Sequence, residues 1–179
     1  PANLEMRRAF DDFRDDPEMH AAILSGEGGR AFSAGMDLKE RAGLDARGGQ
    51  RTAPPPGAAV SFIEMGIFKP IIAAIDGYCV AGGLELSLQC DIRIATAKSQ
   101  FGLPEPRWSL TAGYGLHNLS RMVPLGEALY IQLTGSRISS ERAYQIGLIQ
   151  EVLDSRDSLF ARATEIAEEV KLCAPLAVQ

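Results

Sequence analysis

The chain has 179 residues, of which 46% are hydrophobic and 23% are charged. This length and composition are typical of one globular domain with enough apolar side chains for a sizeable core. The longest unbroken apolar run, residues 71–75, is much shorter than the ~20 residues of a membrane-spanning helix, so we expect no membrane segment. The formal charge of −5 disfavours nucleic-acid binding, which calls for a basic surface.

The cysteine and histidine content argues against two further kinds of site. Three widely spaced cysteines, an odd number, do not make a disulfide framework. With only two histidines and no CxxC spacing, the chain also lacks a credible zinc site. We therefore expect no metal ion and a cytoplasmic location.

Hydrophobic periodicity and the positions of Gly and Pro predict helices and strands that alternate along the chain. The first helix is capped by Asn3 and ends at residues 15–17. Strands are expected at residues 20–25, 70–75 and 92–96, and helices at 58–65, 82–91, 115–121, 127–133, 140–146 and 159–170. A Gly/Pro-rich loop is expected at residues 41–57 and a rigid extended turn at 104–106. This alternation predicts an α/β fold with parallel strands, in a single domain over residues 1–179.

Residues 26–31 match a dinucleotide-binding fingerprint on paper, with Gly26, Gly28 and Ala31 at its key positions. The fingerprint requires a helix to begin there and an acidic residue ~20 positions further on. Gly35 interrupts such a helix, and the acidic position would fall in the Gly/Pro-rich loop. We interpret the match as a plain turn where a strand ends.

Two glycine turns are candidate sites for backbone hydrogen-bond donors. Gly35 lets the chain turn so that the next amide points into a cleft, although the same residues also suit an ordinary helix start. Gly82 and Gly83 begin an apolar helix, where free amides could bind a developing oxyanion or simply allow close packing. Glu85 favours the first interpretation, because a carboxylate in an apolar helix is costly without a partner or a task.

Glu105 lies between Pro104 and Pro106, which restrict the backbone on both sides of it. A proton-transfer group needs such a rigid backbone, whereas a lone glutamate in a Pro-rich turn would more often be a solvated side chain. Two backbone donors and two carboxylates together suit chemistry at the carbons α and β to a carbonyl.

Three ordered motifs resemble the signatures of the crotonase (enoyl-CoA hydratase/isomerase) superfamily. They are residues 31–40 (AFSAGMDLKE), residues 77–91 (GYCVAGGLELSLQCD) and residues 101–106 (FGLPEP) with the turn at Gly113 to Gly115. A weaker similarity extends to residues 139–149. The resemblance implies a spiral of ββα units that binds an acyl-CoA thioester, with no separate cofactor because coenzyme A is part of the substrate. It also implies a homo-oligomer, either a trimer or a dimer of trimers.

The resemblance assigns roles to individual residues. The amides of Met36 and Gly82 would form the oxyanion hole, Glu85 would hold and activate water, and Glu105 would manage the proton at Cα. Gly113 would mark a helix N-terminus near the site. The residues expected along coenzyme A are Ala34, Met36, Asp37, Leu38 and Lys39.

The function that the resemblance implies is enoyl-CoA hydratase, which adds water across a trans-2-enoyl-CoA. Alternatives are an enoyl-CoA double-bond isomerase, a carnitinyl-CoA-type dehydratase, and a non-catalytic relative that binds coenzyme A or serves assembly. The chain departs from the family pattern in its bulky residues: Met36 narrows the expected pocket, and Trp108, Tyr114 and Leu116 bear on which acyl chain it accepts. It is also expected to lack the family's N-terminal strands and C-terminal helices.

Overall fold

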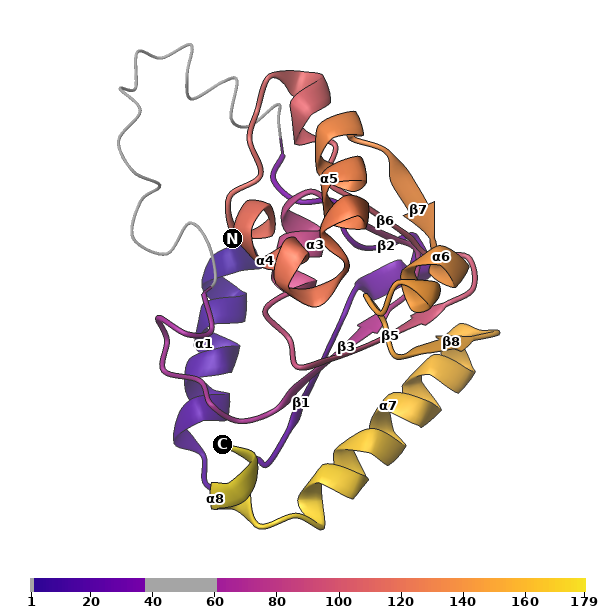
Figure 1. Cartoon of the computed structure of the whole chain (residues 1–179). Coiled ribbons are helices and arrows are strands. Elements are labelled where there is room, and N and C mark those ends of the chain that lie inside the picture. Colours follow the sequence, from indigo (N-terminus) through magenta and orange to yellow (C-terminus); the bar gives the residue numbers. More distant parts are fainter. Residues whose placement is uncertain (1, 38–60) are drawn as a thin grey trace.

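The computed structural model describes residues 2–37 and 61–179, and its described strands form two four-stranded sheets (Figure 1). Sheet A has the order β1-β3-β5-β8 and is parallel throughout. Its strands are β1 (Ala22–Ser25), β3 (Ile71–Ile75), β5 (Ile92–Thr96) and β8 (Glu151–Leu153). Sheet B has the order β2-β4-β6-β7, with β2, β4 and β6 parallel and β7 antiparallel to β6. Its strands are β2 (Ala31–Ser33), β4 (Tyr78–Val80), β6 (Gln100–Gly102) and β7 (Arg137–Ser139).

Consecutive strands alternate between the two sheets. β1 is followed by β2, β3 by β4, and β5 by β6, so that each pair adds one strand to sheet A and one to sheet B. A helix, α3 (Gly82–Ser87), follows the second pair. This repeating arrangement confirms the predicted α/β class and the crotonase-like spiral.

The central strand β3 is buried along its whole length because both faces of sheet A are covered. Side chains alternate across a strand, so Ile71 and Ile75 face the main core. Ile72 and Ala74 face a second cluster on the other side. Helix α7 (Arg156–Lys171) supplies that cluster with Leu159, Ala163 and Ile166, the apolar stripe read from the sequence. Figure 1 shows α7 running along this face of the sheet.

The remaining helices surround the two sheets. Four of them follow the prediction closely: α4 (Tyr114–Met122), α5 (Leu125–Thr134), α6 (Ser140–Gln145) and α7 lie where periodicity placed them. Ser139 caps α6 by accepting a hydrogen bond from the Arg142 amide. The other elements are α1 (Ala2–Asp15), α8 (Pro175–Val178) and the 3-10 helices η1 (Glu27–Gly29) and η2 (Glu105–Trp108). Within the described ranges, no helix combines the length and hydropathy that crossing a membrane requires.

Several local predictions were wrong. Asn3 lies inside α1 rather than capping it. The described part of the expected helix at 58–65 is a turn that ends at Gly66, whose φ of 68° suits only a helix end or a turn. Helix α3 ends at Ser87, because the amides of Gln89 and Cys90 donate to carbonyls only three residues earlier, a tighter turn than the α-helix.

The segment around Glu105 is also not extended. It forms η2, in which the Arg107 amide donates to the Pro104 carbonyl at 3.0 Å. Proline is tolerated here because the first amides of a helix need no internal acceptor. In contrast, the fingerprint at Gly26 was interpreted correctly, since η1 and then β2 follow it instead of a long helix. The predicted loop at 41–57 lies outside the described residues.

Candidate active site

The three motifs meet at one edge of sheet B. Strands β2, β4 and β6 are parallel neighbours, so the segments that follow them lie at the same edge. β2 leads to Gly35 and Met36, β4 leads to Gly82, and β6 leads to Glu105. The fold therefore brings together residues that are up to 70 positions apart in the chain.

The two glycine turns pack backbone against backbone. A Cβ added at Gly35, whose φ is 80°, would lie 2.8 Å from the amide nitrogen of Gly82. A Cβ added at Gly83 would lie 2.1 Å from the carbonyl oxygen of Ser33. Both distances are shorter than a side chain can accommodate, so these glycines are required by the contact. The amides at the two turns are thereby held close to each other.

Ala81 directs the amide of Gly82. It has φ 53° and ψ −134°, a conformation that an alanine adopts only under strain. Two hydrogen bonds hold it there: its amide donates to Gly102 at 3.0 Å, and its carbonyl accepts from the Glu85 amide at 3.1 Å. Gly82 is the first residue of α3, so its amide has no acceptor within the helix. The strained conformation of Ala81 thus directs the Gly82 amide away from the hydrogen-bonding pattern of β4.

Glu85 belongs to the first turn of α3, and its side chain reaches the start of α4. Its Oε1 accepts a hydrogen bond from the Gly115 amide at 2.8 Å. Its two oxygens lie near the other turns as well, since a Cβ at Gly113 would be 3.6 Å from Oε1 and a Cβ at Gly82 would be 3.9 Å from Oε2. The N-terminal end of α4 favours a negative charge at this position. This half-buried carboxylate is therefore fixed on one oxygen.

Glu105 carries the unsatisfied group of the site. Among the described residues, its Oε2 is buried without a hydrogen-bond partner. Burial raises the pKa of Glu105, a backbone hydrogen bond partly offsets this, and the charge of Glu85 raises the pKa further. The effect of Glu85 on this pKa reflects the proximity of the two carboxyl groups. A buried carboxylate oxygen without a partner is costly, and such groups are concentrated at functional sites.

The predicted coenzyme A contacts are only partly described. Ala34, Met36 and Asp37 follow β2 and are exposed, with Met36 at 55%. Leu38 and Lys39 lie outside the described residues. Of the predicted bulky residues, Trp108 is the most exposed, at 65%.

Two surface hollows lie elsewhere, with volumes of about 360 Å³ and 270 Å³. The larger is lined by Arg14, Lys69 and residues of α8, and neither is lined by Glu85 or Glu105. Both cations of the larger hollow are already paired: Lys69 Nζ donates to the Asp16 carbonyl at 2.6 Å, and Arg14 pairs with Asp11 at 2.8 Å. Over residues 2–37 and 61–179, no three His, Cys, Asp or Glu side chains are grouped as metal ligands. The converging glutamates, not the hollows, therefore mark the candidate site.

Comparison with known proteins identifies the family. The sequence profile described as enoyl-CoA hydratase/isomerase matches residues 2–179. The chain belongs to this family. It is 38% identical to the (E)-benzylidenesuccinyl-CoA hydratase of Thauera aromatica, over 93% of this chain and 64% of that protein. It is 34% identical to the short-chain-enoyl-CoA hydratase of Clostridium acetobutylicum and 35% identical to the carnitinyl-CoA dehydratase of Salmonella typhi, in both cases over 98% of this chain and 67% of the relative.

Solved structures of the enoyl-CoA hydratase/isomerase family agree with the fold. A crystal structure of an enoyl-CoA hydratase from Mycobacterium marinum has a TM-score of 0.84 and 36% identity, over 99% of this chain and 68% of that one. An enoyl-CoA hydratase from Bacillus anthracis has a TM-score of 0.81 and 33% identity, over 98% of this chain and 68% of that one. The chain thus spans about two thirds of the length of the family members it matches.

Three features of this family member's site were not predicted from the sequence. They are the strained backbone of Ala81, the hydrogen bond from Gly115 to Glu85, and the buried, unpaired oxygen of Glu105. Gly113 and Gly115 were predicted to form a turn. The only sign in the sequence that Glu85 would pair with this turn was that a carboxylate in an apolar helix needs a hydrogen-bond donor. The strain at Ala81 has no signal in the sequence, since nothing about an alanine indicates that its φ will be positive.

Proposed function

We propose that the chain carries the catalytic core of an enoyl-CoA hydratase, which adds water across the double bond of a trans-2-enoyl-CoA thioester. The observation that carries the proposal is the convergence of Glu85 and Glu105 beside the contact between Gly35 and Gly82. The family match supports acyl-CoA chemistry in general. The choice of hydration rests on the presence of two carboxyl groups rather than one.

The proposed oxyanion hole consists of the amides of Met36 and Gly82, each donating to the thioester carbonyl oxygen. Negative charge develops on that oxygen when a nucleophile adds to Cβ, and each donor of this kind is worth ~3 kcal/mol in the transition state. Support comes from the close approach of Gly35 to the Gly82 amide nitrogen. The exposed residues Ala34 and Asp37 would lie along coenzyme A, together with Leu38 and Lys39.

The two glutamates divide the proton transfers. With Oε1 of Glu85 held by the Gly115 amide, its Oε2 is left to orient a water and accept its proton as the water oxygen bonds to Cβ. Glu105, whose pKa is raised by burial and by the charge of Glu85, delivers a proton to Cα. The electrons of the double bond pass through the enolate and end in the new C–H bond. One water is added in total, and a proton then passes from Glu85 to Glu105 to restore the starting state.

The decisive experiment is the Glu105→Gln variant, assayed by the loss of enoyl-thioester absorbance. Removal of the proton donor should slow hydration by ~10² or more. Glu141→Gln is the matched control, because Glu141 is exposed on α6, away from the candidate site. A near-normal rate for Glu105→Gln would end the proposal, as would an equal loss in the control.

Two related reactions are separated by a second variant. The similarity to a carnitinyl-CoA dehydratase favours testing the reverse reaction, in which water leaves a 3-hydroxyacyl thioester. The family description also includes isomerases, and moving a double bond needs only one carboxylate to shuttle a proton. Glu85→Gln should disable hydration and dehydration alike, but it should largely spare isomerisation. The trimer or dimer of trimers and the cytoplasmic location remain predictions.

A further inference from the structure

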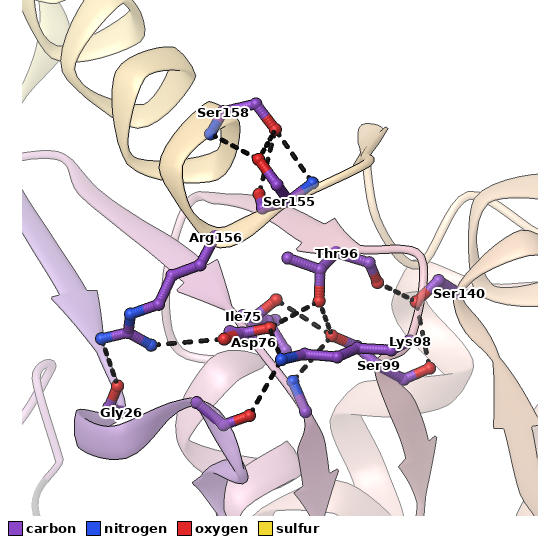
Figure 2. A network of polar contacts seen from close by, with 12 residues as sticks. Gly26, Ile75, Asp76, Thr96, Lys98, Ser99, Ser140, Ser155, Arg156 and Ser158 are labelled. Carbon is purple, nitrogen blue, oxygen red and sulfur yellow. Dashed lines mark hydrogen bonds and ion pairs between the residues drawn. The ribbon is translucent and has the colours of Figure 1, made fainter.

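A second cluster of charged and polar groups lies away from the glutamates, at the turn between β3 and β4 (Figure 2). We call it the Asp76 cluster, and it consists of Asp76, Thr96, Lys98, Ser99 and Arg156. The Asp76 side chain is 1% exposed. Its Oδ1 accepts from Thr96 Oγ1 at 2.8 Å and pairs with Lys98 Nζ at 3.0 Å, while Oδ2 faces Arg156 Nη1 at 3.4 Å. The proposed hydration gives this buried carboxylate no role.

The two cations of the Asp76 cluster hold the turn that precedes β2. Lys98 Nζ donates to the carbonyl of Gly29 at 3.1 Å, and Arg156 Nη2 donates to the carbonyl of Gly26 at 3.1 Å. Arg156 is the first residue of α7, whose start is fixed by a capping box between Ser155 and Ser158. Figure 2 shows both cations reaching from Asp76 to this turn. The start of β2 is therefore tied to Asp76 from two sides.

The same cluster joins the starts of β4 and β6. The Gly77 amide, next to Asp76, donates to Ser99 Oγ at 3.0 Å, and Ser99 Oγ donates to the Ile75 carbonyl at 3.0 Å. One residue further on, the Gln100 amide donates to the Gly77 carbonyl at 3.2 Å. Thus the three parallel strands of sheet B all begin at the Asp76 cluster.

The far ends of these strands carry the proposed oxyanion donors and Glu105. Each strand is only three residues long, and the pairing of β2 with β4 shifts register between Ala31 and Ser33. So short a ladder specifies register weakly. From Gly77 to Gly82 the chain covers roughly 16 Å at about 3.3 Å per residue. A slip at the starts of the strands would be carried directly to the amides at their ends.

We propose that Asp76 is a positioning residue for this site. By holding the starts of β2, β4 and β6 together, it sets the spacing between the amides of Met36 and Gly82 and the carboxyl group of Glu105. The charge of Asp76 is essential to this role, because a neutral side chain could not hold two cations from different parts of the chain. This inference rests on the proposed hydration, and it adds a requirement at the opposite ends of the strands that carry the site.

The test compares Asp76→Asn with Ile166→Ala, a core substitution in α7 that destabilises the protein without touching the cluster. Both variants are assayed below their unfolding temperatures with trans-2-butenoyl-CoA. Asp76→Asn should lower kcat by about tenfold or more with KM changed by less than about twofold, since sub-ångström misplacement acts on the transition state. Ile166→Ala should leave kcat of the folded protein unchanged.

A spectroscopic measurement reports the site independently of turnover. Infrared spectra of bound cinnamoyl-CoA, labelled with ¹³C at the thioester carbonyl, show how strongly the oxyanion donors polarise that bond. Asp76→Asn should reduce the shift of the carbonyl band, whereas Ile166→Ala should retain the full shift. Where Asp76→Asn does not fold, Lys98→Met replaces it, because the Lys98 side chain is 60% exposed and its loss removes only one link. Lys98→Met should give a smaller loss in the same direction, with Lys171→Met on the surface as its control.

The outcomes separate the two proposals. If the unchanged protein hydrates the substrate but the cluster variants keep the full kcat and carbonyl shift, the positioning role is wrong and the proposed function stands. If the unchanged protein binds cinnamoyl-CoA with a shifted carbonyl but hydrates nothing, the proposed function fails, and the carbonyl shift alone decides the role of Asp76. If the protein neither binds nor hydrates, both proposals fail together.

Discussion

The substitution Gly35→Ala tests the contact between the two glycine turns. At a φ of 80°, the left-handed backbone conformation destabilises the folded state of any L-residue other than glycine by about 1 kcal/mol. The new Cβ would also lie 2.8 Å from the Gly82 nitrogen and 3.1 Å from the Ala81 Cβ. The neighbouring atoms must move to make room for this Cβ, which destabilises the folded state by a further ~1–3 kcal/mol. We expect the free energy of unfolding to fall by about 3 kcal/mol in total.

Gly147→Ala is the matched control for this prediction. Gly147 has the same φ of 80°, but a Cβ there would meet no described atom within 4 Å. It should therefore lose only about 1 kcal/mol, the backbone cost alone. Urea denaturation of both variants measures the difference, and hydration assays should show a loss of about 10²-fold or more for Gly35→Ala only, because its Cβ sits against an oxyanion donor. Equal unfolding free energies, or full activity in Gly35→Ala, would refute the reasoning.

Three further predictions concern Glu105, Asp76 and Ala81. The pKa of Glu105 is raised in the fold, so the stability it contributes is present in acid and lost as pH rises through that pKa. Glu105→Gln should accordingly raise the free energy of unfolding at neutral pH, and thermal melts should show the gain disappearing in acid, below about pH 4. The pKa of Asp76 is lowered by Thr96, Lys98 and Arg156 against the opposing effect of burial, so its contribution is present above about pH 4 and is lost as pH falls through the folded pKa. As the pH is lowered below about 4, the free energy of unfolding should thus fall less steeply for Asp76→Asn than for the unchanged protein. Equal slopes of unfolding free energy against pH would contradict this. Ala81→Gly should relieve the strain at φ 53° and raise the melting temperature slightly, yet kcat should fall severalfold because the Gly82 amide is held less firmly; unchanged kcat would count against a role for the strain.

The sequence predicted the elements that have their own hydrophobic period. Strand β3 and helix α7 were predicted correctly. The apolar run at 71–75 and the apolar stripe from Leu159 to Val170 are each longer than the apolar segments of loops. The strands of sheet B were missed because each has three residues, too few to show alternation. β4 is one of these missed strands. Its existence depends on pairing with β2 and β6, which are distant in sequence.

The candidate site could be predicted as a set of residue types but not as a geometry. Glu85, Glu105 and the glycines at 35 and 82 were chosen because each is costly or unusual where it stands. What places them together is the parallel order of β2, β4 and β6, which no local pattern contains. The Asp76 cluster was not predicted at all, since Asp76 directly follows a buried strand, where an acidic turn residue is common. Its carboxylate is enclosed by residues that are distant in the chain: Thr96 and Lys98, and Arg156 of α7, 80 positions later.

The most direct test of the central claim is a crystal structure of the protein with a bound acyl-CoA thioester. We predict that the thioester carbonyl oxygen lies about 2.7–3.1 Å from the amide nitrogens of both Met36 and Gly82. The carboxyl groups of Glu85 and Glu105 should face Cβ and Cα from the same side. A carbonyl oxygen bound away from these amides, or carboxyl groups that point in opposite directions, would contradict the mechanism.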